Sequence, residues 1–595
     1  MQNFKAALTA YNTKNFQKSL DIIDEFKLSN LDAHLLKAAS LTALNKNDKA
    51  IEIYQFALKK SPKSTPLLEN YTGLLCKLGD FISCLNLLNT TATTVSAKLT
   101  LNKLEALIKL GHLLEAKKLV QLINTPTNLE FRFLWLKIEL HEALGELDII
   151  ENIINKLPEA QQNNVYISYK RACNLRNMGR FNEALDLLLN IEIKKSTTPE
   201  VLYLIGCIYK DLNNNQQCER YLNQCLTIAP YYVPAHESLN KLYYSTKNNK
   251  LFLSSYKLVK QKYEPHPVIE HSFISQLIKS DSYESALDVS TNALKLFPND
   301  QAILHAHSVV LGKLNDHEKA FNLLNQLVKK APHESRYRID LANYLIMNGD
   351  YINAIAQLES ALKYDYFNQE VWAYLSTAWR LSANDKYHWL TNYDQYVKVF
   401  ELKKPKGYST SGQFFENFTD LLLNLHAHST QLLDQSVRSG SQTEGHLLFR
   451  SNKLINDFKH SMNNCITSYL ANLPKDQSHP LCSRNNNAFK VNGSWSVKLG
   501  NKGFHANHIH PAGWLSAPSY ISLPNELNEN DTNKSGWLKL GETCLNLKER
   551  EEIARSICPK TGQMIIFPSY IWHGTYPLKS TQPRLTVPCD VMPIL

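Results

Sequence analysis

A cluster of histidines near the C-terminus has the residue type and the spacing that a metal ion requires. His508 and His510 are separated by one residue. In an extended strand residues i and i+2 project from the same face, so the two imidazoles can hold one metal ion between them. A third histidine, His573, follows 65 residues after His508, near the end of a later predicted strand. These three residues are the predicted metal ligands.

An arginine and a threonine follow the third histidine on a common strand face. Arg584 lies eleven residues after His573, and Thr586 has the same parity as Arg584. A guanidinium group binds a carboxylate through two parallel hydrogen bonds, so this pair suits a cosubstrate that carries a carboxylate. Tyr520, on another predicted strand, is a candidate hydrogen-bond donor to the same cosubstrate. No catalytic residue is predicted beyond the metal ligands.

Other residues are expected around this site. His505 has the opposite parity to His508, so we expect a supporting or surface position for it unless a bulge intervenes. Asp590 shares the parity of Arg584 and is expected to support the barrel. The remaining candidate pocket residues are Trp495, Asn507, Trp572, Asp434, Gln435 and Arg438. The two tryptophans belong either to the pocket wall or to the barrel core. The polar stretch that holds the last three either covers the barrel mouth or forms an ordinary capped loop.

The elements that must position these side chains are short strands. Runs of alternating hydrophobicity, separated by Gly, Asn and Pro, predict strands at 495–499, 520–523, 537–540, 564–567 and 585–587. Helices are expected over 417–433 and 453–473. We therefore expect an all-β jelly-roll domain over residues 476–595. A helical connector over residues 401–475, which begins the same region, precedes it.

The first two-thirds of the chain repeats with a regular period. A mostly small marker residue recurs every 34 residues, with one interval of 32, at Ala50, Cys84, Ala116, Ile150, Ala184, Cys218, Phe252, Ala286, Ala320 and Ala354. Twelve residues after the marker, a proline is expected to end the second helix of a unit, at Pro62, Pro230, Pro298 and Pro332. A polar turn without glycine precedes Phe252, and there we expect the array to bend or widen.

This periodic pattern resembles the tetratricopeptide repeat, a helix pair that buries its apolar face only by stacking on its neighbours. The resemblance implies an all-α right-handed superhelix of about 11 helix pairs over residues 1–400. It also implies a concave groove that binds a protein or peptide partner.

The stretches that carry the candidate site form a second recognisable pattern. They are residues 433–443, 493–497, 505–516, 562–575 and 584–586. Together they resemble the Fe(II)/2-oxoglutarate-dependent dioxygenase superfamily, and more narrowly a bacterial group in which tetratricopeptide repeats precede such a domain. The resemblance implies a double-stranded β-helix, with His508 and His573 as iron ligands and Arg584, helped by Thr586, as the anchor of 2-oxoglutarate. Members of the superfamily usually carry a carboxylate where this chain has His510.

The resulting hypothesis is a multidomain dioxygenase, specifically a hydroxylase, that uses Fe(II) and 2-oxoglutarate. Its repeats would recruit a protein or another macromolecular substrate. Two alternatives stay open. One is an interaction scaffold whose barrel is a degenerate metal-binding module. The other is a cupin-like metalloenzyme that does not use 2-oxoglutarate, because three imidazoles also suit zinc or copper.

Composition argues against several other classes of protein. The net charge of +10 is spread along 595 residues without a basic block, which argues against a nucleic-acid partner. No run of about 18 apolar residues predicts a membrane span, and the N-terminal residues lack a signal-peptide pattern. The 11 cysteines are scattered and form no CxxC pair, so neither a disulfide framework nor a structural zinc site is expected. The predicted location is the cytoplasm.

Overall fold

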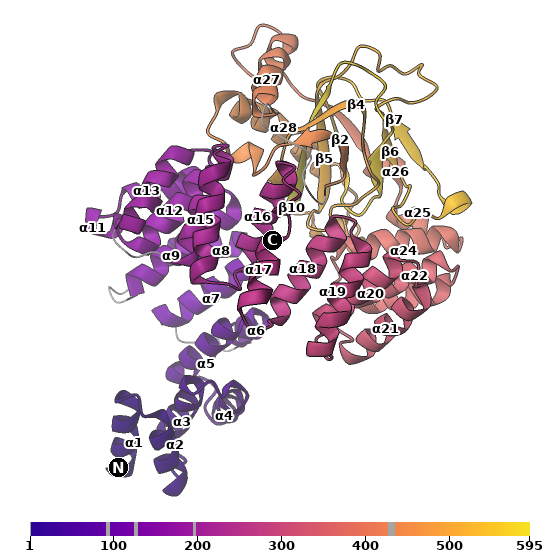
Figure 1. Ribbon diagram of the computed structural model, residues 1–595. Coiled ribbons are helices and arrows are strands. Elements are labelled where there is room, and N and C mark those ends of the chain that lie inside the picture. The colour runs from indigo at the N-terminus through magenta and orange to yellow at the C-terminus, as the bar shows by residue number, and fades with distance from the viewer. Residues whose placement is uncertain (1, 91–95, 124–128, 194–197, 427–432, 434) are drawn as a thin grey trace. The chain divides into compact units, whose positions relative to one another are not determined.

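Figure 1 shows the computed structural model of the chain. The structure describes residues 2–90, 96–123, 129–193, 198–426, 433 and 435–595. The chain divides into two compact units, one formed by Met1–Ile153 with Ile594–Leu595 and the other by Ile154–Pro593. The three predicted metal ligands lie in the second unit.

The first unit is helical, and helices that follow one another in the chain pack against each other. They are α1 Gln2–Asn12, α2 Phe16–Glu25, α3 Leu31–Ala43, α4 Asn47–Lys60, α5 Thr65–Leu78, α6 Phe81–Thr90, α7 Ala97–Lys109, α8 Leu113–Leu122, α9 Glu130–Leu144 and α10 Leu147–Asn155, whose last two residues fall in the second unit. The marker residues Ala50, Cys84 and Ala116 each lie in the second helix of a pair and are fully buried. Their small side chains let the two helix axes approach closely.

The second unit continues the helix pairs. They are α12 Val165–Asn177, α13 Phe181–Ile193, α14 Pro199–Asp211, α15 Asn215–Ile228, α16 Val233–Ser245, α17 Ser254–Lys262, α18 Pro267–Lys279, α19 Tyr283–Leu296, α20 Gln301–Lys313, α21 His317–Lys330, α22 Ser335–Met347 and α23 Tyr351–Leu362. Short or unpaired helices are α11 Glu159–Gln162, α24 Gln369–Leu381, α25 Lys386–Leu390 and α26 Tyr393–Tyr396. The predicted all-α repeat architecture is thus confirmed.

The predicted helix ends agree with the structure. Pro62, Pro230, Pro298 and Pro332 each lie two residues after the last residue of α4, α15, α19 and α21. A proline at this position cannot continue the helix, because its ring removes a backbone donor and clashes with the preceding turn.

One repeat differs from its neighbours in the length of the connection between its two helices. Helix α17 begins nine residues after α16 ends, whereas α15 and α19 begin four residues after the helices that precede them. The marker Phe252 falls in this longer connection, and Leu253 adopts a left-handed backbone with φ of 62°. A non-glycine residue pays a steric cost for that conformation, so the connection is locally strained.

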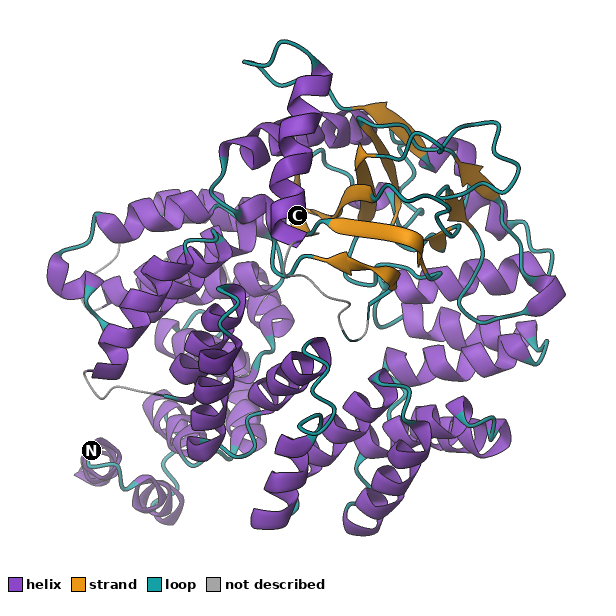
Figure 2. Ribbon diagram, turned by 45° about the horizontal axis from the view of Figure 1, so that its top comes forward, coloured by secondary structure: helices purple, strands orange, loops and turns teal. Residues whose placement is uncertain are grey.

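The remaining residues of the second unit build an antiparallel sheet structure, shown as orange arrows in Figure 2. The larger sheet has the order β1-β8-β5-β10-β4-β2, with β3 also paired to β10, and the smaller has the order β7-β6-β9. The strands are β1 Lys398–Glu401, β2 Val437–Gln442, β3 Phe489–Ser494, β4 Val497–His505, β5 Leu515–Ser522, β6 Leu538–Leu540, β7 Arg555–Ile557, β8 Gln563–Pro568, β9 His573–Thr575 and β10 Arg584–Pro593. This arrangement agrees with the predicted jelly roll.

The sheet takes in segments that lie before the predicted barrel boundary at residue 476. Strand β1, at the end of the predicted repeat array 1–400, pairs with β8, and β2, inside the predicted helical connector 401–475, pairs with β4. The helices of that connector are α27 Ser411–His426 and α28 Lys453–Ala471. Strand β2 occupies most of the polar stretch that was expected either to cover the barrel mouth or to form a capped loop. Strand β3 ends at Ser494 and β4 begins at Val497, so the predicted strand 495–499 starts two residues too early.

The last repeats and the barrel share one hydrophobic core. A single cluster of buried side chains runs from Leu324 in α21 through Trp372 and Trp379 in α24 to Phe567 in β8 and Val591 in β10. Burial of this kind stabilises by roughly 25 cal/mol per Å² of apolar surface. Helices α21 to α24 and the sheet are therefore packed as one body within the second unit. Over the described residues, no helix combines the length and apolar character that a membrane crossing needs.

Candidate metal centre

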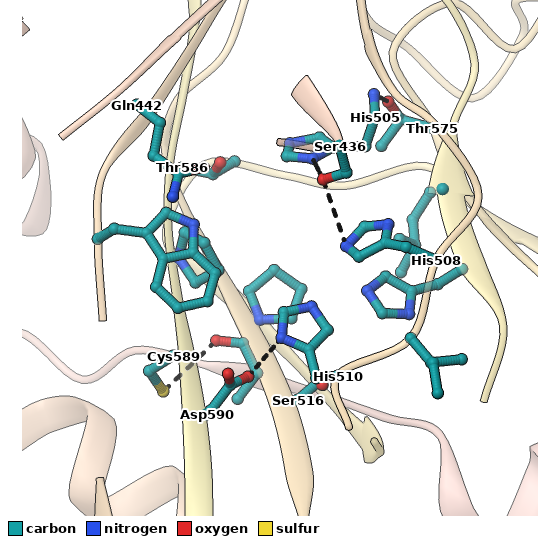
Figure 3. Close-up of a pocket in the computed structure, with 18 of the residues that line it drawn as sticks. Ser436, Gln442, His505, His508, His510, Ser516, Thr575, Thr586, Cys589 and Asp590 are labelled. Atoms are coloured by element: carbon teal, nitrogen blue, oxygen red, sulfur yellow. Dashed lines mark hydrogen bonds and ion pairs between the residues drawn. The ribbon is translucent and has the colours of Figure 1, made fainter. Parts of the chain in front are cut away.

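Three histidines converge in the second unit (Figure 3). One side-chain nitrogen from each of His508, His510 and His573 lies within 4.8 Å of the other two. His508 and His573 form an isolated antiparallel bridge, in which their backbone N–H groups donate to each other's carbonyls at 2.9 and 3.0 Å. The backbone N–H of His510 donates to the carbonyl of Ser569 at 3.2 Å. Main-chain pairing therefore brings the three imidazoles together.

A contact at Nδ1 orients each of these rings. Nδ1 of His508 donates to the carbonyl of Ala506 at 2.8 Å, and Nδ1 of His573 donates to the carbonyl of Ile571 at 3.0 Å. A carbonyl oxygen only accepts, so both protons lie on Nδ1 and the lone pair lies on Nε2. Nδ1 of His510 lies 2.7 Å from a carboxylate oxygen of Asp590. Each ring thus has Nε2 as the nitrogen that can bind a metal ion.

The electrostatic environment keeps His508 and His573 neutral. Burial, together with the neighbouring His510, lowers the pKa of His508 to about 3. Burial also lowers the pKa of His573 well below its ordinary value, and the neighbouring histidines act in the same direction. A metal ion requires the neutral form of histidine, so both rings are ready to bind without first losing a proton.

The histidines line a cavity of about 650 Å³. That volume lies within the range of small-molecule sites, roughly 300–1,000 Å³. Its wall includes the metal-ligand candidates and also Gln435, Ser436, Gln442, Trp495, His505, Ser516, Tyr520, Thr575, Arg584, Thr586 and Asp590. The predicted cosubstrate residues and the predicted metal ligands therefore border the same cavity.

Arg584 and Tyr520 present buried polar atoms to this cavity. The Arg584 side chain is 2% exposed, and its Nε and Nη1 have no hydrogen-bond partner among the described residues. The hydroxyl of Tyr520 likewise has none there, and the guanidinium carbon lies 5.1 Å from the centre of its ring. Burial lowers the pKa of Arg584, while the neighbouring Tyr520 acts in the opposite direction. Buried donors without partners are unusual in proteins and call for a ligand or another explanation.

Sequence reasoning missed part of the cavity wall. Strand β2 and the residue before it contribute Gln442 and Ser436, and His505 faces the cavity despite its opposite parity. His505 ends strand β4, so strand parity does not extend from it to His508. Its Nδ1 lies 3.2 Å from the hydroxyl of Ser436, and its backbone N–H donates to the hydroxyl of Thr575 at 2.8 Å. In the sequence, the cavity-facing position of His505 could be anticipated only by allowing for a bulge between His505 and His508.

Two expected pocket residues, Trp572 and Asn507, point elsewhere. The indole N–H of Trp572 donates to the Ala373 carbonyl at 3.2 Å and the Thr377 hydroxyl at 3.1 Å, so this side chain packs against α24. Its neighbour His573 faces the cavity, and adjacent strand residues project to opposite faces. The amide of Asn507 donates to the Thr543 carbonyl at 3.0 Å instead.

Of the other candidate pocket residues, Arg438 lies away from the cavity and two line it. Arg438 is exposed, and its guanidinium donates to the carbonyls of Gln435 and Val437. Gln435 itself lines the cavity, as does Trp495, whose ring is nearly parallel to that of His510 with centroids 5.8 Å apart. Asp434 lies outside the described residues.

Comparison with protein families identifies two parts of the chain. Residues 493–590 match the family described as "Putative 2OG-Fe(II) oxygenase", and residues 199–232 match the family described as "Tetratricopeptide repeat". The two resemblances predicted from the sequence are confirmed over these residues. The oxygenase match contains His508, His510, His573 and Arg584, and it ends at Asp590. The family description implies Fe(II) and 2-oxoglutarate as its cofactor and cosubstrate.

Three solved structures match the chain at low identity and with TM-scores of 0.30 or less. Yeast Tom70 is 15% identical with a TM-score of 0.30, over 65% of this chain and 96% of that one. The Cut9-Hcn1 hetero-tetramer of APC/C is 14% identical with a TM-score of 0.26, over 64% and 89%. PilF of Pseudomonas aeruginosa is 15% identical with a TM-score of 0.26, over 32% and 86%. No curated protein matches the chain.

Proposed function

We propose that the C-terminal part of this chain is an Fe(II)- and 2-oxoglutarate-dependent dioxygenase that hydroxylates its substrate, and that the repeats recruit a protein or another macromolecular substrate. One observation carries the proposal. A single cavity is bordered both by the three-histidine cluster and by the buried guanidinium of Arg584, two of whose nitrogens lack partners among the described residues.

The histidine cluster fits a divalent metal ion. His508, His510 and His573 would hold Fe(II) through nitrogens that already lie within 4.8 Å of one another. Imidazole nitrogen suits iron as well as zinc and copper. Because His508 and His573 are neutral and all three rings have a contact at Nδ1, the site is arranged before the metal arrives, so little conformational entropy opposes binding.

The arginine side of the cavity fits a carboxylate. Arg584 would bind a carboxylate of 2-oxoglutarate, Thr586 would add a hydroxyl contact, and Tyr520 would donate its unpartnered O–H. A guanidinium group that is buried and unpaired costs free energy until an anion binds it. The cosubstrate would therefore satisfy donors that the protein itself leaves open.

Fe(II) with 2-oxoglutarate would supply the oxidising power for O₂-dependent hydroxylation, with conversion of 2-oxoglutarate to succinate and CO₂. The protein contributes orientation and exclusion of water. Arg584 and Thr586 come from one face of β10, and the histidines come from β9 and the segment after β4, so rigid strands set their relative positions. Trp495 and Gln442 border the same cavity and would contact the cosubstrate or the substrate.

The repeats are proposed to deliver the substrate. Stacked helix pairs form a continuous surface that can bind an extended partner. In the second unit this surface is connected rigidly to the oxygenase part, because α24 bonds to Trp572, the residue before His573. A partner bound on the last repeats would therefore be held at a fixed distance from the cavity.

The test is anaerobic purification of the full chain followed by metal analysis and an assay of 2-oxoglutarate decarboxylation with and without Fe(II). We expect about one iron per chain and turnover that requires both iron and 2-oxoglutarate. Absence of iron binding, or of any turnover by the iron-loaded protein, would overturn the dioxygenase proposal. It would leave the interaction scaffold with a degenerate barrel.

The donor set favours one second candidate. A third imidazole, in place of the usual carboxylate, also suits a zinc or copper enzyme of cupin type that does not use 2-oxoglutarate. Arg584→Ala separates the two. It should abolish 2-oxoglutarate binding in a dioxygenase and leave the activity of a cupin-type enzyme largely unchanged.

A further inference from the structure

Asp590 lies next to Nδ1 of His510, one of the three histidines. Its carboxylate oxygen is 2.7 Å from Nδ1 of His510, and both side chains are largely buried, at 13% exposed for His510 and 14% for Asp590. Figure 3 shows this contact at the foot of the His510 ring. In the described part of the chain, no Lys or Arg side chain forms an ion pair with Asp590.

The three histidines differ in what holds their outer nitrogen. His508 and His573 donate to neutral backbone carbonyls, whereas His510 faces the carboxylate of Asp590. His510 is also the residue that stands where the superfamily usually has a carboxylate ligand. His510, the ligand that replaces the usual carboxylate, is therefore also the ligand that has a carboxylate at its outer nitrogen.

The surroundings fix this arrangement. The ring of Trp495 lies parallel to His510 within 8°, with centroids 5.8 Å apart. Asp590 lies on β10 opposite Gly493 of β3, where an added Cβ would approach Trp495 to 3.4 Å and the second carboxylate oxygen of Asp590 to 3.9 Å. Strand pairing holds the aspartate on one side of His510, and the indole covers the ring face. The imidazole therefore has a carboxylate oxygen 2.7 Å from its outer nitrogen and an indole ring parallel to one face.

We propose that Asp590 is a positioning residue that supplies, through the ring of His510, the negative charge that a carboxylate ligand would otherwise bring to the metal. The inference rests on the metal site of the proposed function. A carboxylate hydrogen-bonded to the outer nitrogen of a metal-binding histidine increases the basicity of the ring and fixes its orientation. Asp590 itself is outside the group of ligand atoms that lie within 4.8 Å of one another, so it acts through His510.

The first test measures metal affinity rather than activity. Asp590→Asn keeps the shape and an acceptor oxygen but removes the charge. It should weaken Fe(II) binding to the full chain, measured anaerobically by competition with a chelator, by about 10- to 100-fold. It should also shift the visible absorption bands of the Co(II)-loaded protein. Asp590→Glu, which keeps the charge, should retain more of the affinity than Asp590→Asn.

A matched control is Glu551→Gln. Glu551 is another part-buried carboxylate of the second unit, and it accepts hydrogen bonds from the backbone and hydroxyl of Thr543 at 3.0 and 2.6 Å. This change removes a carboxylate charge away from the cavity and should leave both metal affinity and the Co(II) spectrum unaltered. An equal loss of affinity in Glu551→Gln would assign the effect to general destabilisation and overturn the proposal.

The second test places a carboxylate at the metal directly. In the His510→Asp background the metal gains its own negative ligand, so adding Asp590→Asn should no longer weaken binding and should remove a repulsion between two carboxylates. Equal weakening by Asp590→Asn in both backgrounds, or none in the wild type, would overturn the inference. If the wild type binds Co(II) but Fe(II) supports no 2-oxoglutarate turnover, the proposed function fails alone and the affinities still decide the role of Asp590. A wild type that binds neither metal would overturn both.

Discussion

Replacing Arg584 by methionine should make the metal-free protein more stable while it destroys cosubstrate binding. The guanidinium is 2% exposed, and its Nε and Nη1 lack partners among the described residues. Each buried unsatisfied donor costs about 1–3 kcal/mol, so the pair costs about 2–6 kcal/mol. The contact with the Tyr520 ring offsets about 1–2 kcal/mol of that. Methionine has a similar length and no polar hydrogen. The net gain is therefore about 0–5 kcal/mol, with a middle value of about 2.5 kcal/mol.

Scanning calorimetry of the full chain without metal measures this gain. A gain of 1 kcal/mol corresponds to a rise of about 2–4 °C in the melting temperature of a cooperative unit of 150–250 residues. A second set of scans adds 2-oxoglutarate together with a redox-inert divalent metal. At a concentration 100 times its Kd, the cosubstrate should stabilise the wild type by about 2.7 kcal/mol and should not stabilise Arg584→Met at all.

Arg550 provides the matched control. Its guanidinium donates to the carbonyls of Ile346 and Met347 and to the hydroxyl of Tyr351, at 3.1, 2.8 and 3.0 Å. Arg550→Met breaks satisfied hydrogen bonds and should lower the melting temperature, opposite in sign to Arg584→Met. If Arg584→Met also lowers the melting temperature and 2-oxoglutarate still raises it, then Arg584 has a structural role and the reasoning from its unpartnered nitrogens is refuted.

Three further predictions concern the ligands, the protonation of the site and the edge of the barrel. His508→Ala should reduce anaerobically bound Fe(II) by about 10-fold or more, as measured by atomic emission, whereas His505→Ala should retain it; equal losses would contradict the ligand assignment. Because burial lowers the pKa of His508 to about 3, the unfolded chain binds more protons than the folded one between pH 6.5 and 3, and stability falls as the pH drops through that window. In urea unfolding of the metal-free protein, the free energy of unfolding should fall by about 2 kcal/mol more in the wild type than in His508→Gln between pH 7 and 5. Parallel pH profiles of the two proteins would contradict this prediction. Gly440→Ala would place its Cβ 2.6 Å from the Lys498 carbonyl and should lower the melting temperature by several degrees. Gly412→Ala, whose Cβ would have its nearest atom at 3.7 Å, should leave the melting temperature unchanged. A larger loss in Gly412→Ala than in Gly440→Ala would show that β2 is not essential to the barrel.

The helical repeat could be predicted in detail because its period is redundant. Ten markers repeat the same packing requirement, and prolines such as Pro62 and Pro332 lie two residues after helices. At the irregular marker Phe252 the connection is longer than those of its neighbours, and the expected bend or widening of the array stays a prediction. Local physical rules, namely small residues at close helix contacts and proline at helix ends, determine these features.

The candidate site could be predicted only where the chain is close to an ideal strand. Arg584 and Thr586 share a face of β10, as parity requires. Strand β2 was not recognised because Val437–Gln442 lacks alternating hydrophobicity; it contributes Gln442 to a polar cavity rather than to an apolar core. The direction of Trp572 depends on helix α24, which lies about 200 residues earlier in the chain, and no local pattern reveals that partner.

The buried cluster that runs from Leu324 to Val591 has a consequence for how such a protein can be divided, whether by recombination or in the laboratory. A cut near residue 400 would separate Trp372 and Trp379 from the other buried side chains of this cluster. Each piece would then expose a large apolar surface, which favours aggregation. The smallest transplantable piece that holds the candidate site therefore starts no later than α21, so the barrel and its last repeats would be inherited together.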